Sequence, residues 1–164
     1  MAPKKHSSKS APKIRAVTLP SDLNFRRVLV PIDFSETSVQ AFKCALGFAQ
    51  KLGATLYLLH VYEAPSFMAG YPTLPTMVKV SDDEVLQKLR ISLDALIPPD
   101  LSVKVQSFVR KGKPYIEIPK LAEEQNIDLI IISTHGYTGL KHTLLGSTTE
   151  RVVQHAPCPV LVVR

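Results

Sequence analysis

Apolar runs of strand length alternate with stretches of helical periodicity along the chain from Phe25 onward. Most of these runs are continuously apolar and rich in Val, Ile and Leu, which is typical of strands covered on both faces of a sheet. One run, Leu101–Val105, alternates apolar and polar residues and indicates a half-exposed strand near a sheet edge. The predicted strands span residues 27–32, 55–61, 101–105, 128–132 and 160–163.

Four helices are predicted between these strands, and each has a recognisable boundary. Ser35 is predicted to cap the first helix, and Gly53 to end it. Two capping boxes, Ser81–Glu84 and Ser147–Glu150, predict the starts of the second and fourth helices. Pro114 suits the first turn of the third helix, where its missing N–H costs nothing. The apolar residues at helical spacing are Val39, Phe42, Ala45, Leu46, Ala49 and Leu52, then Val85, Leu89, Leu93 and Leu96, then Ile116, Ile118, Leu121 and Ala122, and finally Val152 and Val153.

The alternation of strand and helix predicts a parallel sheet, because consecutive parallel strands need right-handed crossover connections. We therefore predict an α/β, Rossmann-like open sheet of five parallel strands in the order 3-2-1-4-5, with helices on both faces. In such sheets, ligands bind beyond the carboxyl ends of the strands, where the strand order reverses. With the first and fourth strands at that point, Asp33 and the loop from Ser133 to Ser147 converge on one crevice.

Charge changes this picture mainly at the N-terminus. Residues 1–24 are rich in Ser, Lys, Pro and Ala, and five of the formal +6 charges precede the first acid, Asp22. We predict a disordered basic tail over residues 1–24, followed by one folded domain over residues 25–164. The rest of the chain is close to neutral, and no aromatic residue lies among the lysines to stack on bases, so a nucleic-acid partner is not favoured.

The cysteines and the lengths of the apolar runs indicate the compartment. Cys44 and Cys158 are far apart and show neither a Cys-x-x-Cys pattern nor zinc spacing with histidine, so we interpret them as buried, reduced thiols. No apolar run approaches the ~20 residues that a membrane-spanning helix needs, and no secretory signal is visible. We therefore expect a cytoplasmic protein without membrane contact.

The stretch over residues 130–150 is the most informative for function. A buried β-branched run ends at the small residue Ser133, a loop begins at Gly136, and Gly146 opens a helix. This order is typical of a phosphate cradle. Glycines let backbone amides approach oxygens closely, and a helix N-terminus adds unpaired N–H groups with partial positive charge. The stretch therefore predicts a mononucleotide site.

Roles for individual residues follow from their charge and hydrogen-bonding groups. Gly146, Ser147 and Thr148 are predicted to hold phosphate oxygens through amides and hydroxyls. An alternative for Ser147 is that it only caps the helix. Asp33 would repel phosphates, so we expect it to bond the ribose or base. An alternative for Asp33 is an ordinary turn residue or helix cap.

Signs of catalysis are weak in the sequence. Histidine in general titrates near neutral pH, which suits acid–base catalysis, but neither His135 nor His142 has a nucleophile with a base-and-orienter arrangement nearby. Loop hydrogen bonding is therefore favoured for both, and His135 is included in the predicted nucleotide site. No Walker lysine follows a G-x4-G pattern, so a P-loop NTPase is not expected. No carboxylate pair marks a magnesium site, so any Mg²⁺ would arrive with the nucleotide.

Taken together, these elements resemble the universal stress protein family over roughly residues 26–164. ATP-binding members of that family have the pattern G-x2-G-x9-G-[S/T]. Gly136, Gly146 and Ser147 fit this spacing, whereas Ser133 replaces the first glycine. The resemblance rests on Val28–Asp33, Leu59–Val61, Gly112–Pro114, Asp128–Ile131, the glycine loop and Pro157–Val163.

The resemblance implies a stress-response or signalling module that binds ATP or another adenine nucleotide, without enzymatic activity beyond slow ATP hydrolysis. Pro31 and Val61 correspond to adenine-contacting positions of the family, although core packing is an alternative for both. Two other functions remain open. One is a dimeric interaction protein that no longer binds nucleotide, and the other is a nucleotidyl- or phosphotransferase. The transferase is disfavoured because the loop lacks a general base and an oxyanion-stabilising set of Arg and Lys.

The last strand predicts a homodimer. Val160–Val163 is short, apolar and β-branched, so at a sheet edge it would be an aggregation hazard without cover. Pairing with its own copy about a two-fold axis would cover it, and the family resemblance also implies antiparallel contact of these strands. The alternative is an edge covered by the chain's own N-terminal segment.

Overall fold

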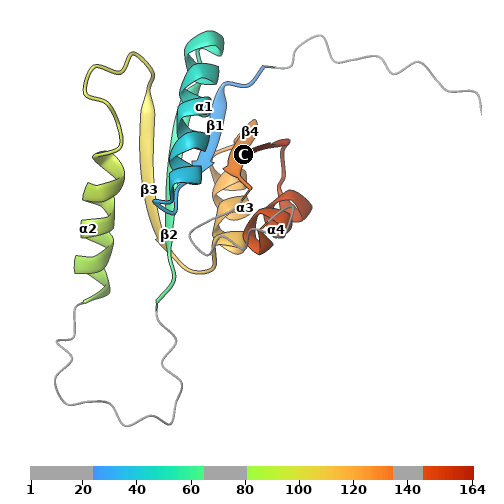
Figure 1. Cartoon of the computed structure of the whole chain (residues 1–164). Helices are drawn as coiled ribbons and strands as arrows, with labels where there is room; N and C mark the ends of the chain where they lie inside the picture. Colours follow the sequence, from blue (N-terminus) through green and yellow to red (C-terminus); the bar gives the residue numbers. More distant parts are fainter. Residues whose placement is uncertain (1–23, 65–80, 135–145) are drawn as a thin grey trace, which may run out of the picture.

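The computed structural model describes residues 24–64, 81–134 and 146–164, in which strands and helices alternate along the chain (Figure 1). The strands are β1 (Arg27–Pro31), β2 (Thr55–Tyr62), β3 (Val105–Lys111), β4 (Leu129–Ser133) and β5 (Val160–Val163). The helices are α1 (Glu36–Leu52), α2 (Asp82–Asp94), α3 (Pro114–Glu124) and α4 (Ser147–His155). Within these ranges, no helix combines the length and the apolarity needed to cross a membrane. Apart from residue 24, the predicted basic tail lies outside the described residues.

The strands form one parallel sheet in the order β3-β2-β1-β4-β5, which confirms the prediction. β1 is central, because Val28 pairs with Leu56 of β2 on one side and with Leu129 of β4 on the other. The chain first builds the sheet from β1 toward β3 and then returns to the opposite side of β1 with β4. The carboxyl ends of β1 and β4, at Pro31 and Ser133, therefore flank the point where the strand order reverses.

Helices cover both faces of the sheet and create two hydrophobic cores. One core lies between the sheet and α1 with α2, and the other between the sheet and α3 with α4 (Figure 1). Successive residues of β1 alternate between them: Val28 and Val30 belong to the first core and Leu29 to the second. All three side chains are fully buried. This two-sided burial explains why the strand is continuously apolar in the sequence.

Several predicted helix boundaries are confirmed. Ser35 caps α1, because its Oγ accepts the N–H three residues on at 3.2 Å. Gly53 ends the helix in the left-handed region, with φ 65°, which glycine adopts without a Cβ clash. Ser81 Oγ accepts the Glu84 N–H at 3.3 Å and caps α2. Pro114 is the first residue of α3, as its lack of an N–H predicts.

The predicted third strand was wrong in position. Only its last residue, Val105, belongs to β3, which continues to Lys111 and pairs with β2. The alternation within residues 101–105 has a different cause: Leu101 and Val103 pack against the core under α1 and α2 while the chain approaches the sheet. β3 itself is an edge strand of mixed polarity, so its sequence lacks the apolar run that marked the central strands.

Both cysteines are free, but Cys44 and Cys158 are half-buried rather than buried as predicted. Burial, together with the negative charge of Asp128, raises the pKa of the Cys158 thiol above its ordinary value. Since both causes disfavour the thiolate, Cys158 stays a neutral thiol near pH 7.

Candidate functional site

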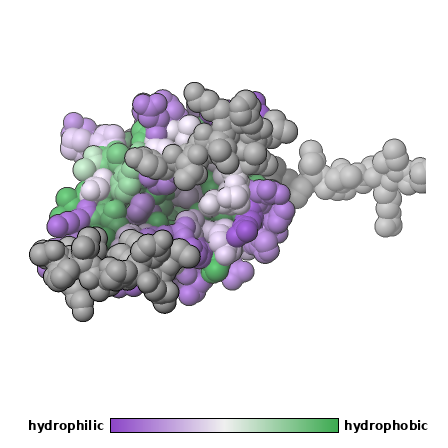
Figure 2. Space-filling model, turned by 60° about the horizontal axis from the view of Figure 1, so that its bottom comes forward, coloured by the Kyte–Doolittle hydropathy of each residue, from purple (hydrophilic) through white to green (hydrophobic). Residues whose placement is uncertain are grey.

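A cavity opens at the carboxyl ends of β1, β2 and β4, where the strand order reverses, and its described lining encloses about 230 Å³. Figure 2 turns this end of the molecule toward the viewer and shows exposed apolar side chains bordered by polar ones. The lining residues are Pro31, Ile32 and Asp33, Ser38 of α1, Leu59 and Val61 of β2, Pro114 and Ile118 of α3, Ile132 and Ser133 of β4, and Gly146, Ser147, Thr148 and Thr149 at the start of α4.

Most of the residues predicted from the sequence lie together in this one cavity. His135 and Gly136 fall outside the described residues. The predicted residues that line the cavity are Pro31, Asp33, Val61, Ser133, Gly146, Ser147 and Thr148. They come from four separate parts of the chain, which the switch point of the sheet brings to one place.

Sequence reasoning missed several lining residues. Leu59 could have been found, because it lies two positions before Val61 on the same strand and therefore on the same face. Ser38, Pro114 and Ile118 lie in helices, and only the packing of those helices against the sheet brings them to the cavity. Pro114 has a local signal, because it begins a helix soon after a strand, whereas none distinguishes Ser38 and Ile118 from other helical residues.

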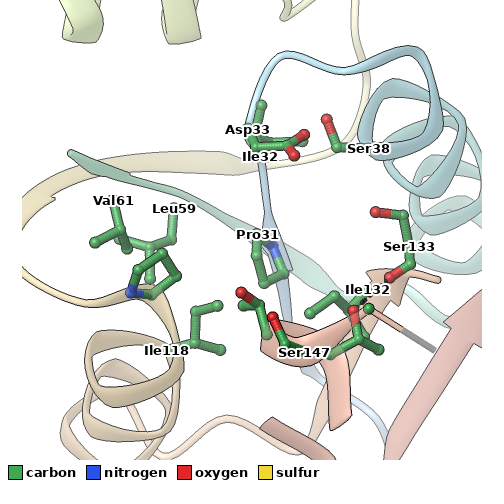
Figure 3. Close-up of a pocket in the computed structure, with 14 residues that line it drawn as sticks. Pro31, Ile32, Asp33, Ser38, Leu59, Val61, Ile118, Ile132, Ser133 and Ser147 are labelled. Carbon is green, nitrogen blue, oxygen red and sulfur yellow. Dashed lines mark hydrogen bonds between the residues drawn. The ribbon is translucent and has the colours of Figure 1, made fainter. Parts of the chain in front are cut away.

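Side chains of different character occupy different sides of the cavity (Figure 3). Leu59 and Val61 lie together on one side, and Ser133 lies on the opposite side, with Pro31 between them. Asp33 lies beyond Pro31, next to Ser38. A ligand with one flat apolar group and one polar group is complementary to such a lining.

Asp33 takes part in a tight turn between β1 and α1. Its Oδ1 accepts the Ser35 N–H at 3.0 Å and also the Ser35 hydroxyl. Between Asp33 and Ser35, the backbone of Phe34 has φ 64°, a left-handed conformation that is uncommon and unfavourable for a residue with a bulky side chain. The turn role weighed for Asp33 in the sequence is therefore real, and the same residue also lines the cavity.

Two hydrogen bonds attach the start of α4 to the end of β4. The Gly146 N–H donates to the Thr134 carbonyl at 2.7 Å, and the Thr149 hydroxyl donates to the Ser133 carbonyl at 2.8 Å. Thr149 is only 4% exposed, so its hydroxyl makes this bond inside the protein. The first turn of α4 is thereby held beside the last residue of β4, with Gly146 through Thr149 lining the cavity.

The predicted capping role of Ser147 was wrong. Gly146 is the N-cap, with φ −67° and ψ 151°, and Ser147 is the first helical residue. No side chain makes the cap hydrogen bond of α4. The first N–H groups of any helix lack partners within the helix, so here they form a positively polarised end at the cavity. Because Ser147 does not cap α4, its hydroxyl is not used in the way that the capping box predicted.

The helix end is the main positive feature of the described lining. Among those lining residues, only Asp33 has an ionisable side chain. Arg110 of β3, which is in register with the lining residue Val61 of β2, pairs with Glu117 at 3.4 Å and also with Glu124. The hydrogen bond to Glu124 raises the pKa of Arg110, and the same contact lowers the pKa of Glu124. In the part of the chain that the structure describes, no group of three or more His, Cys, Asp or Glu residues could hold a metal ion.

Comparison with known proteins identifies the family. A model of the universal stress protein family matches residues 24–164. The chain belongs to this family. It is 33% identical over 154 residues to universal stress protein MJ0577 of Methanocaldococcus jannaschii, across 85% of this chain and 95% of that one. It is 32% identical over 145 residues to universal stress protein MJ0531 of the same organism, across 85% of this chain and 82% of that one.

Solved structures of family members have the same fold. The structure of MJ0577 matches with a TM-score of 0.69 and 28% identity, over 85% of this chain and 96% of that one. A universal stress protein solved in complex with cAMP matches with a TM-score of 0.56 and 22% identity, over 86% and 98% of the two chains. The Archaeoglobus fulgidus protein solved with dAMP matches with a TM-score of 0.59 and 16% identity, over 86% and 99%.

Proposed function

We propose that this universal stress protein is a stress-response or signalling module that binds an adenine nucleotide, with ATP as its ligand. The observation that carries the proposal is the cavity at the switch point, which joins apolar side chains to the N-terminal end of α4. The structurally similar proteins solved with cAMP and dAMP support an adenine nucleotide as the ligand class.

In this proposal the adenine contacts Pro31 and Val61, and Asp33 accepts a hydrogen bond from the ribose or the base. An apolar strand end suits the faces of a purine, whereas a carboxylate beside phosphates would be repelled. The phosphates lie against Gly146, which has no side chain to block their approach, and contact the amides and hydroxyls of Ser147 and Thr148, where the partial charge of the helix end is positive. His135 and Gly136 complete the proposed nucleotide site, and any Mg²⁺ is carried by the phosphates.

Binding rather than catalysis is the proposed activity. A transferase needs a general base and groups that stabilise charge in the transition state. Among the described lining residues, Asp33 is the only candidate base, and its Oδ1 already accepts two hydrogen bonds from Ser35. We therefore propose that nucleotide occupancy acts through the protein's surface or partners. A steady turnover above ~1 s⁻¹ with one defined acceptor would instead indicate an enzyme.

A homodimer through β5 is also proposed. β5 lies at the end of the strand order, and all four of its residues, Val160–Val163, are half-buried in the isolated chain. An apolar edge strand of this kind gains by pairing with a second copy, which satisfies its backbone groups and covers its side chains.

The nucleotide proposal is tested by two measurements on the purified protein. Mass spectrometry of released small molecules identifies any nucleotide that is retained, and calorimetry with ATP measures its affinity. We expect Asp33→Ala to weaken ATP binding by about 1–3 kcal/mol, the usual cost of removing one partner of a buried hydrogen bond. Asp100→Ala, an equal change at an exposed position away from the described cavity, is the control.

The outcomes separate the alternatives. An empty cavity together with no heat of ATP binding would indicate the interaction protein that lacks a nucleotide. Tighter ATP binding by Asp33→Ala would show that the carboxylate lies beside the phosphates, which would reverse its proposed role.

A further inference from the structure

The turn that carries Asp33 is contacted from β2 by a residue outside the cavity. His60 lies between Leu59 and Val61, which line the cavity, so its side chain points to the opposite face of the sheet. Its Nδ1 lies 2.7 Å from the Ile32 carbonyl oxygen. Because a carbonyl can only accept, Nδ1–H is the donor. His60 therefore binds the backbone immediately before Asp33.

The same imidazole also contacts the residue immediately after Asp33. The rings of His60 and Phe34 have centroids 4.6 Å apart and are tilted by 41°. Phe34 has the unfavourable left-handed φ of 64°, and its ring packs against the core under α1 and α2. A conformation of this kind persists only where the surroundings hold it. The contact with His60 is one of the interactions that hold it.

The two flanking residues of Asp33 are thus restrained by one side chain. The Ile32 N–H donates to the Leu59 carbonyl at 2.8 Å, so β2 holds both backbone groups of Ile32. From the other side, Ser35 donates its N–H and its hydroxyl to the Asp33 carboxylate. The direction of the Asp33 side chain depends on this arrangement, because the backbone has few alternatives when both neighbours are held.

We propose that His60 is a positioning residue for nucleotide binding: from the face of the sheet opposite the cavity, it holds the turn that directs Asp33 toward the nucleoside. This inference rests on the proposed function, since it assigns His60 an effect on nucleotide affinity that passes through Asp33. His60 itself does not contact the ligand. Its contribution is the hydrogen bond to Ile32 and the ring contact with Phe34.

A double-mutant cycle measured by calorimetry with ATP tests the proposal. His60→Phe retains a ring beside Phe34 but removes the donor to Ile32. We expect it to weaken ATP binding by about fivefold to tenfold in the native background. In an Asp33→Ala background it should change the affinity by less than about twofold, because the residue through which it acts is gone.

Two further variants make the test specific. His60→Asn places an amide nitrogen the same number of bonds from Cα as Nδ1, so it should keep ATP affinity within about threefold of the native value. His155→Phe is the matched control. His155 makes the same kind of hydrogen bond, from Nδ1 to the Arg151 carbonyl at 2.8 Å, but it lies exposed at the other end of α4.

Each outcome bears on a different claim. An equal loss of affinity in both backgrounds, or no loss in either, would overturn the positioning role while leaving nucleotide binding intact. No ATP binding by the native protein would overturn the proposed function, and the positioning role with it. Should His60→Phe fail to fold, as judged by thermal unfolding, His60→Leu replaces it in the cycle, since it also lacks the donor.

Discussion

Replacing Thr149 by Val would test how the start of α4 is held at the cavity. The substitution preserves the branched shape of the side chain and removes its hydroxyl, which donates to the Ser133 carbonyl at 2.8 Å. Thr149 is 4% exposed, so water cannot easily take the place of the lost donor. We expect the free energy of unfolding to fall by about 1–3 kcal/mol, the usual cost of removing one partner of a buried hydrogen bond.

The effect of Thr149→Val on binding should be large for a ligand with phosphate groups and small for a ligand without them. The Gly146 N–H still donates to the Thr134 carbonyl at 2.7 Å in this variant, so α4 keeps one of its two attachments to the end of β4. A more loosely attached α4 would misplace its backbone amides, which are proposed to hold phosphate. It would leave in place the apolar side chains proposed to hold adenine, because these lie on the strands. We therefore expect ATP affinity to fall about tenfold, equivalent to about 1.4 kcal/mol, and adenosine affinity to change by less than about twofold.

Calorimetry with ATP and with adenosine, alongside urea unfolding, would measure both effects. Thr149→Ser retains the hydroxyl and should recover most of the ATP affinity, although it loses a buried methyl group. If Thr149→Val weakened ATP and adenosine by the same factor, the hydrogen bond would serve general stability only. If ATP affinity were unchanged in a folded variant, the start of α4 would not be the phosphate site.

Three other substitutions test separate parts of the structure. Gly146→Val should fold, because valine can adopt φ −67° and ψ 151°. It should lose ATP binding, because its branched side chain would occupy the space proposed for the phosphates. Calorimetry that finds native ATP affinity would disprove the proposed site. Val162→Pro removes a backbone donor of β5 and should shift the protein toward monomer or aggregate; light scattering that finds the native protein monomeric at high micromolar concentration would rule out the dimer. Gly112→Ala should lower the free energy of unfolding by about 1–2 kcal/mol, since its Cβ would lie 2.9 Å from Glu117 Cγ at φ 154°. Gly47→Ala is the control for this change, because nothing lies within 4 Å of its added Cβ, and helix propensity favours alanine by about 1 kcal/mol.

The sequence by itself determined the features that depend on local chemistry. The two-sided burial of β1 appears as an uninterrupted apolar run, the cap of α1 as Ser35, and the end of that helix as Gly53. Pro31 and Ser133, at the ends of two strands, and Gly146, before a helix, mark where the chain changes direction. In a parallel sheet such positions at strand ends and helix starts collect at one edge, which is why many residues of the cavity could be named beforehand.

Only the tertiary structure decided the features that depend on contacts between distant segments. The sequence placed the third strand too early, because core packing of Leu101 and Val103 imitates the alternation of an edge strand. The sequence also predicted Ser147 as the N-cap of the fourth helix, whereas the N-cap is Gly146. The capping-box pattern alone cannot show whether the serine or the glycine before it is the N-cap.

The supports of the cavity belong to this second group. The contact of His60 with Phe34 and the hydrogen bond from Thr149 to Ser133 join residues from different elements. Neither has a local signature, because a histidine in a strand and a threonine in a helix are ordinary residues until packing supplies their partners. A local pattern specifies where the chain turns, whereas the direction of a side chain at that turn depends on what the rest of the fold places against it.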